Sequence, residues 1–186
     1  MGTRPARLGQ AAAAAAFSPA ISTLVARLTP TSRQARVFGG YGAYAEGWGL
    51  YSEVLTKEMG FYQDPMSEFG MYSLSLWRAI RLVLDTGIHD QRWSRDQAIR
   101  YFVDNGLLSL RDVTKEVDRY INNPGQATSY MIGQLKILEL RDRARTQLGP
   151  RFDIRQFHSV VLENGAVPLD VLEELVDTWI AQRRNG

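Results

Sequence analysis

Hydrophobic residues recur at helical spacing from Tyr41 to the end of the chain, and no stretch alternates between apolar and polar positions as a strand would. The pattern predicts a first helix over roughly 42–59, ending at Gly60. It predicts a second helix from about Ser67 to Thr86, with Gly87 as its stop. Further helices are predicted over 95–104, from Ser109, from Pro124 to about Leu148, from Asp153 to about Asn164, and from Pro168.

Polar residues at the expected helix starts support these boundaries. Two of the starts carry a capping-box pattern, in which the capping side chain is followed three residues later by its partner: Ser94 with Gln97, and Asp153 with Gln156. Ser109 with Asp112 opens another helix. Pro124 and Pro168 suit a first helical turn, because proline lacks the amide hydrogen that is left unbonded there. The sequence therefore predicts an all-α fold of about seven or eight helices with short connections.

The first forty residues differ in composition from the rest. They contain five arginines and no acid, which makes them +5, so the remainder of a chain of net charge +2 is −3. An export signal, a helix packed on the body and a disordered or miscalled start are three interpretations of this segment. We predict a disordered or unreliable segment over 1–19, a helix over 20–28, and one α-helical domain over 20–186.

Composition excludes several kinds of site. The 186 residues include no cysteine, so disulfides and thiolate metal sites are ruled out, and the only histidines are His89 and His158. Two zinc-binding histidines one helical turn apart therefore cannot come from this chain. The body is mildly acidic, which argues against a nucleic-acid partner, and no apolar run is long enough to span a membrane.

Glu46 is the first candidate for chemistry, because it lies in a helix among Tyr44, Trp48 and Tyr51. A lone carboxylate in apolar surroundings is costly and is expected to be paired or to bind a metal. A buried arginine or lysine, a metal ion and a helix edge each explain the charge. From spacing alone, an ion pair is favoured over a metal.

A second group lies on the helix that contains "LWRAIRLVLDTGIH". Arg78 and Arg81 follow one stripe with Asp85, and Arg81 and Asp85 have the spacing of an i, i+4 ion pair. The ordinary interpretation is a solvated face with a salt bridge. The functional one is an arginine that Asp85 holds ready for a substrate carboxylate, with His89 as a donor to a reacting group or as a surface histidine.

The segment "NNPGQATSYMIG" supplies the third group. Tyr130 lies on the same side as Gln126, and its phenol suits stabilisation of an oxyanion. A core tyrosine with a satisfied hydroxyl is the ordinary alternative, and it is the favoured one on sequence alone. We interpret His158, which lies in an amphipathic helix, as structural.

Four segments together resemble a known family. They are "YAEGWGLYSE", "WRAIRLVLDTGIHDQRWSRDQAI", "NNPGQATSYMIGQLKILELRDRA" and "VLENGAVPLDVLEELVDTWI". In this order they resemble the C-terminal part of a bacterial family catalogued as domain of unknown function 885, over residues 30–183. Members of that family look like zinc metallopeptidases of the gluzincin kind, with large helical bodies that carry an H-E-x-x-H-type motif.

The resemblance implies roles for the candidate residues. Glu46 matches the glutamate that supplies the third zinc ligand, and Tyr130 matches a tyrosine brought to the scissile carbonyl. His89 is implied as a further catalytic group, and Arg78, Arg81 and Gln126 are implied as contacts to a peptide substrate.

One departure from the family pattern limits the implied activity. The paired zinc histidines and the general base would precede Glu46, where this sequence has no histidine. The resemblance thus implies the C-terminal portion of a larger peptidase domain, inactive and at most a weak zinc binder alone, whose other half or a second copy is a partner. The rival hypothesis is a non-catalytic helical module that binds a peptide or a partner subunit. The sequence leaves the compartment, cytoplasmic or exported in a bacterium, open.

Overall fold

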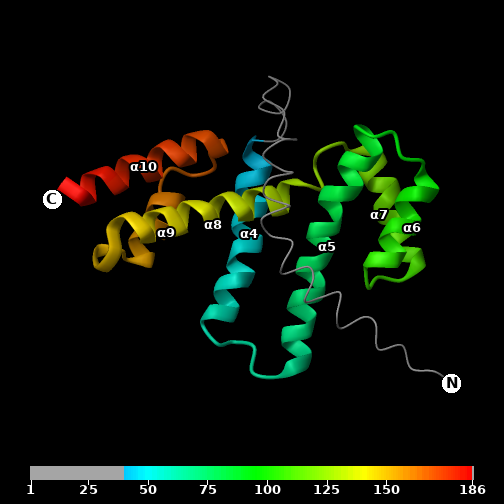
Figure 1. Ribbon diagram of the computed structural model, residues 1–186, viewed down its shortest axis with the longest axis horizontal. Helices are drawn as coiled ribbons and strands as arrows, with labels where there is room; N and C mark the ends of the chain where they lie inside the picture. Colours follow the sequence, from blue (N-terminus) through cyan, green and yellow to red (C-terminus); the bar gives the residue numbers. More distant parts are fainter. Residues whose placement is uncertain (1–39, 186) are drawn as a thin grey trace. The chain divides into compact units, whose positions relative to one another are not determined.

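The computed structural model describes residues 40–185, which form seven α-helices and one short 3-10 helix (Figure 1). No strand occurs in that range, so the all-α prediction is confirmed. The helices are α4 (Gly40–Glu58), α5 (Pro65–His89), α6 (Arg95–Asn105), α7 (Leu110–Asn122), α8 (Ser129–Leu148), η1 (Gly149–Arg151), α9 (Ile154–Leu162) and α10 (Leu169–Asn185). None of these helices combines the length and the apolar character that crossing a membrane requires.

The helix starts follow the polar residues that the sequence marks. The Ser94 hydroxyl accepts the amide of Gln97, whose side chain accepts the amide of Ser94, so the capping box of α6 is complete. Ser109 caps α7, and Asp153 caps α9 by accepting the Arg155 amide. These short polar side chains satisfy amide groups that the first turn leaves unbonded.

Two boundaries differ from the prediction. Gly87 does not end α5, which continues to His89. The glycine serves close packing instead, because a Cβ at this position would lie 2.6 Å from the indole of Trp93. The helix predicted from Pro124 begins instead at Ser129, and a turn with φ +80° at Gly125 occupies the residues before it.

The described residues divide into two compact units, each with its own core. Unit 1 is residues 56–127 and unit 2 is residues 40–55 with 128–185. Prediction of a single domain over 20–186 stays a prediction. The predictions of a disordered or unreliable segment over 1–19 and of a helix over 20–28 concern residues outside the described range.

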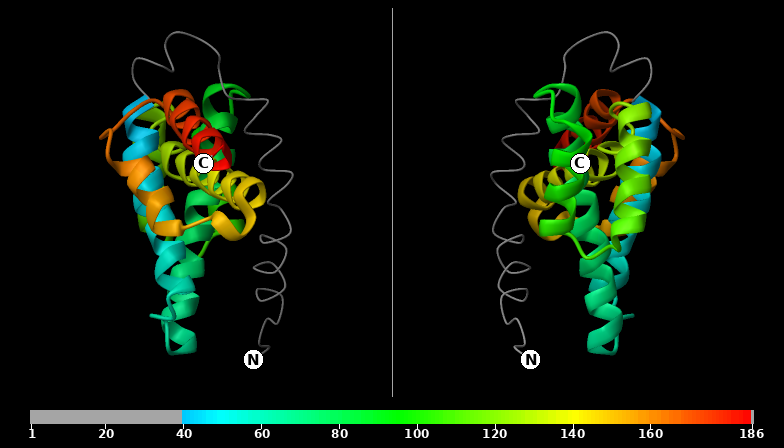
Figure 2. Two further views of the ribbon diagram at one scale, coloured as in Figure 1. Left: turned by 90° about the vertical axis from the view of Figure 1, so that its left-hand side faces the viewer. Right: turned by 90° about the vertical axis from the view of Figure 1, so that its right-hand side faces the viewer.

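Unit 1 packs α5, α6 and α7 together, with α6 and α7 side by side (Figures 1 and 2). Its core is formed by apolar side chains that all three helices and the turn after α7 contribute: Ile80, Leu84, Ala98, Phe102, Val113, Val117, Tyr120 and Ala127. Large apolar side chains are exposed where α4 ends and α5 begins, including Met59, Phe61, Met66 and Phe69.

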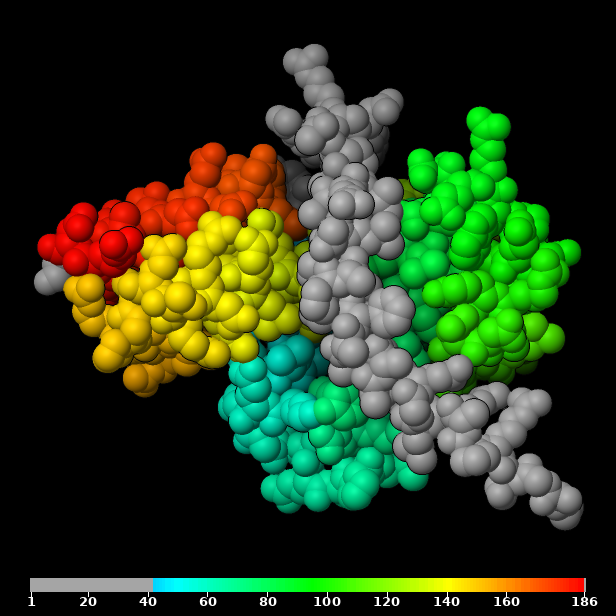
Figure 3. Space-filling view, in the orientation of Figure 1, coloured from blue at the N-terminus to red at the C-terminus, as the bar shows by residue number. Residues whose placement is uncertain are grey.

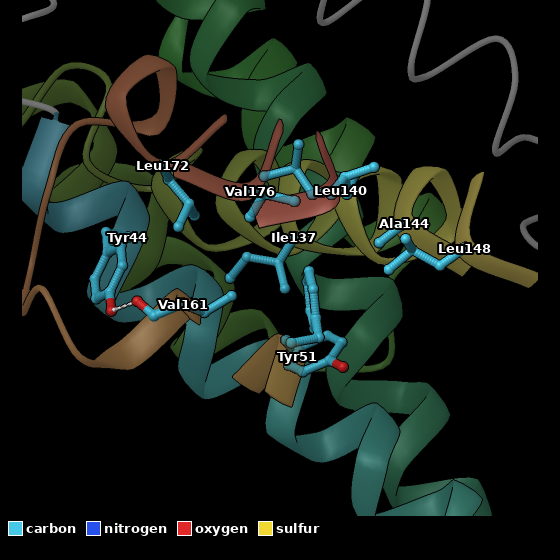
Figure 4. Close-up of a cluster of buried hydrophobic side chains, with 11 residues drawn as sticks. Tyr44, Tyr51, Ile137, Leu140, Ala144, Leu148, Val161, Leu172 and Val176 are labelled. Carbon is cyan, nitrogen blue, oxygen red and sulfur yellow. Dashed lines mark hydrogen bonds between the residues drawn. The ribbon is translucent and has the colours of Figure 1, made fainter. Parts of the chain in front are cut away.

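Unit 2 packs α10 along α8 and against α9, as the ribbon and space-filling views show (Figures 1 and 3). Its core holds Tyr44 and Tyr51 from α4 against apolar side chains of α8, α9 and α10 (Figure 4). The Tyr44 hydroxyl donates a hydrogen bond to the carbonyl oxygen of Val161 on α9. Both tyrosines are buried, so Tyr44 and Tyr51 belong to a closed core.

Helices α4 and α8 meet at two glycines. A Cβ on Gly47 would lie 2.4 Å from the Cα of Gly133, and a Cβ on Gly133 would lie 1.8 Å from the carbonyl oxygen of Ala43. Only glycine at both positions lets the two backbones approach this closely. Near the same contact, the Gln134 side chain donates a 2.9 Å hydrogen bond to the Leu50 carbonyl.

Candidate functional site

The structure separates Glu46 from the aromatic residues that surround it in the sequence. Tyr44, Trp48 and Tyr51 follow one stripe of α4 and face the core of unit 2. Successive residues of an α-helix turn by about 100°, so Glu46 points about 200° away from Tyr44, to the other side of the helix. The prediction that aromatic side chains surround this carboxylate is therefore wrong. Helical periodicity alone places Glu46 on the other side of the helix.

Glu46 lies instead beside the contact between α4 and α8, next to Gly47, and is partly buried. Within residues 40–185 the structure gives its carboxylate no hydrogen bond and no ion pair, which sets aside an arginine or lysine of this range as its partner. Tyr130, also partly buried, lies one turn before Gly133 on α8. Both candidates therefore belong to unit 2 and lie within one helical turn of the same helix contact.

The aromatic stripe of α4 has polar partners of its own. Arg141, which is 5% exposed, donates to the Tyr51 hydroxyl at 3.3 Å, and that hydroxyl lies 2.9 Å from Nε2 of His158. The tautomer of His158 determines which of these two groups donates. Trp48 meets the imidazole edge-on at 5.4 Å. His158, which is partly buried, thus completes a polar chain with Arg141 and Tyr51, in keeping with a structural role.

Arg81 also lies in a buried network, in unit 1. Its Nη2 forms an ion pair of 3.2 Å with Glu116, its Nε donates to the Tyr120 hydroxyl at 3.0 Å, and its guanidinium lies 4.5 Å from the Trp77 ring centre. The i, i+4 pair with Asp85 that the sequence suggested does not form. Glu116, 35 residues later, takes that place because α7 packs directly on α5.

The network shifts the pKa values of its members. Burial pushes the pKa of Glu116 up, but hydrogen bonds from Arg119 and Tyr120 and the charges of Arg119 and Arg81 outweigh it, and the pKa falls below its usual value. Burial raises the pKa of Tyr120. Glu116 is therefore an anion in the folded protein, and the cation of Arg81 is neutralised internally.

Asp85 is a buried carboxylate in unit 1, only 6% exposed. Its two oxygens lie 3.0 and 3.1 Å from the amide nitrogen of Gly125, in the turn before α8. Burial raises the pKa of Asp85, and the Gly125 amide and the charges of His89 and Arg119 offset this only in part.

The remaining candidates lie around these networks. His89 is exposed, and its Nε2 lies 2.9 Å from the carbonyl oxygen of Tyr120, to which it donates. The Gln126 side-chain oxygen accepts from Arg119. Arg78 donates to the Leu74 carbonyl one turn earlier at 3.1 Å. Their proposed substrate contacts stay predictions.

The six candidates thus fall into two groups. Glu46 and Tyr130 lie in unit 2, whereas Arg78, Arg81, His89 and Gln126 lie in unit 1. Sequence reasoning missed Glu116 and Tyr120. Nothing local marks an acid on α7 as the partner of an arginine on α5.

Comparisons with known proteins place these residues in a family context. Residues 20–176 match the family described as bacterial protein of unknown function, DUF885. Among curated proteins, none matches the chain.

Two solved structures are similar to the chain. A candidate lipoprotein from Colwellia psychrerythraea is 47% identical, with a TM-score of 0.75 over 80% of this chain and 26% of that one. A candidate lipoprotein of unknown function from Shewanella oneidensis is 27% identical, with a TM-score of 0.69 over 83% of this chain and 28% of that one. The chain thus spans about a quarter of the length of both.

Proposed function

The chain belongs to the bacterial DUF885 family, and from this premise we propose that it forms the C-terminal helical part of a zinc-dependent peptidase. In this proposal Glu46 is one zinc ligand and Tyr130 donates a hydrogen bond to the carbonyl oxygen of the scissile peptide bond. The four segments resemble this family, and the reaction class rests on the likeness of the family's members to gluzincin-type zinc peptidases.

The state of Glu46 is the observation that carries the proposal. A partly buried carboxylate normally has a cation or a hydrogen-bond donor beside it, because removal of a charge from water is costly. Glu46 has neither within residues 40–185. A dication held partly by residues outside this range would supply the missing positive charge.

The described residues fit one ligand of such a site and not a whole one. Catalytic zinc sites take three protein ligands and keep a position open for water. No group of three potential ligands occurs among residues 40–185. The other ligands would belong to the part of the protein that the longer relatives possess and this chain does not span. When bound, the zinc supplies a water of lowered pKa as the nucleophile.

Residues of this chain would bind and polarise the substrate. A phenol at Tyr130 is a neutral donor suited to an oxygen on which negative charge develops. The glycine contact between Gly47 and Gly133 holds the helices of Glu46 and Tyr130 together without intervening side chains. This rigidity favours a fixed spacing between a metal ligand and an oxyanion donor.

Metal content and hydrolysis in the full-length Colwellia relative test the proposal. We expect the purified relative to contain zinc and to cleave peptides. Substitution of the residue that superposes on Glu46 by Gln should lower the zinc content, and substitution of the residue that superposes on Tyr130 by Phe should lower kcat while zinc is retained. A relative without zinc or peptide cleavage would favour a helical binding module.

A matched pair of variants tests the ligand in this chain itself. Calorimetric titration should show weak zinc binding that Glu46→Gln removes. Glu53→Gln is the control, because Glu53 lies two turns later on the same side of α4. Tight zinc binding by this chain alone, unaffected by Glu46→Gln, would contradict the assignment of Glu46.

A further inference from the structure

The turn over residues 123–128 occupies a place where the local sequence is compatible with a helix start and with a turn. Asn123 is a good N-cap residue, Pro124 suits the first helical position, and Gln126 stands three residues after the cap. Pro124 followed by Gly125 equally suits a type II turn, in which the glycine has a positive φ. The helix begins only at Ser129, so a contact from outside the segment can decide between the two conformations.

The structure identifies a tertiary contact at this point. The carboxylate of Asp85, forty residues earlier on α5, receives the Gly125 amide on both oxygens. Gly125 has a φ of +80°, which lies outside the helical region, so the residue that donates to Asp85 cannot at the same time continue a helix. The contact and an early helix start exclude each other.

We propose that Asp85 is a positioning residue, whose carboxylate holds the Gly125 amide and thereby makes α8 begin at Ser129 rather than near Pro124. Under the function proposed above, on which this consequence rests, a start at Ser129 places Tyr130 in the first turn of α8, whereas a start near Pro124 would place it in the second. Arg119 assists by donating to Gln126 from α7.

The carboxylate has few other partners that would explain its burial. The charged groups that face it are His89 on α5 and Arg119 on α7, and the turn itself contains no titratable side chain. A buried carboxylate at 6% exposure is costly to keep for packing alone. The hydrogen bonds that the Asp85 carboxylate accepts from the Gly125 amide, which hold the turn, account for this burial.

The test is nuclear magnetic resonance of the full chain. In the native protein, the Gly125 amide proton should titrate with the same midpoint as the Asp85 carboxyl carbon, because a charged acceptor shifts the proton more than a neutral one. In Asp85→Asn, this titration should vanish, the Cα shifts of residues 125–128 should move toward helical values, and protection of the Gly125 amide from exchange should fall about tenfold.

Asp104→Asn is the matched control, because Asp104 is exposed on α6. It should leave the Gly125 signal and the shifts of residues 125–128 unchanged. If Asp85→Asn does not fold, the titration of the native chain still decides the question. A Gly125 amide that does not follow Asp85, or residues 125–128 that stay non-helical in a folded Asp85→Asn, would overturn the proposal.

The result is independent of the peptidase proposal. Loss of the turn in Asp85→Asn, with no zinc in the Colwellia relative, would support the positioning role of Asp85 and contradict the peptidase proposal. An unchanged turn, together with zinc loss when the residue that superposes on Glu46 is replaced, would contradict the role of Asp85 and support the peptidase proposal.

Discussion

Gly47 and Gly133 touch backbone to backbone, with the Cβ that Gly47 lacks falling 2.4 Å from the Cα of Gly133. This contact joins α4 to α8 inside unit 2. Ala43 and Leu50, which flank it one turn away on α4, are both buried. The contact thus fixes how two helices far apart in the sequence pack.

Gly133→Ala should destabilise the protein by about 3 kcal/mol, because its methyl group would overlap the Ala43 carbonyl oxygen and force the helices apart. Gly49→Ala on α4 is the control, since nothing lies within 4 Å of its expected Cβ. This control should gain about 0.5–1 kcal/mol from helix propensity. Urea unfolding of both variants measures the difference, and equal stabilities would show that the helices do not meet in this way.

Tyr51→Phe should cost about 1–3 kcal/mol, because it leaves the buried Arg141 and the partly buried His158 without the hydroxyl between them. The phenyl ring keeps the packing. Tyr72→Phe removes a hydroxyl that is exposed on α5 and should stay within about 0.5 kcal/mol of the native protein. Thermal unfolding measures the stability of both variants. A Tyr51→Phe protein as stable as Tyr72→Phe would show that the Tyr51 hydroxyl does not bridge Arg141 and His158.

The ionised Glu116 should make part of the stability of the protein dependent on pH. Its pKa lies below the usual 4.5 in the folded protein. The resulting stability is present above the usual pKa and is lost as pH falls through the lowered one. The stability gap between the native protein and Glu116→Gln should therefore narrow on acidification.

Urea unfolding of both proteins at about pH 7 and about pH 3 measures this narrowing. A stability difference between the native protein and Glu116→Gln that stays constant would show that Glu116 is not ionised against Arg81 and Arg119.

Asp85 should have the opposite effect on stability. Its pKa is raised in the folded protein, so its ionisation costs stability as pH rises. The Asp85→Asn variant should therefore become less stable relative to the native protein on acidification.

Local signals in the sequence were sufficient for most helices and insufficient for the contacts between them. The starts of α6, α7 and α9 were predicted because Ser94, Ser109 and Asp153 bond to amides two or three residues away. The start of α8 was not, because Asp85 acts from α5.

The same distinction applies to the candidate site. The partner of Arg81 comes from α7, and no spacing rule reaches across 35 residues. The side of the helix that Glu46 occupies was open to prediction, since it follows from about 100° per residue. Its zinc ligation and the role of Tyr130 stay proposals.

The segments of the chain that form each unit also determine when that unit can fold during synthesis. Every residue of unit 1 that is described here lies between 56 and 127, so its core closes from neighbouring segments. Tyr44 of unit 2 must wait for Val161, 117 residues later, and long loops close slowly. On the ribosome, α4 therefore emerges first and stays without its core until α9 and α10 have been translated. During that interval its aromatic stripe is exposed to chaperones.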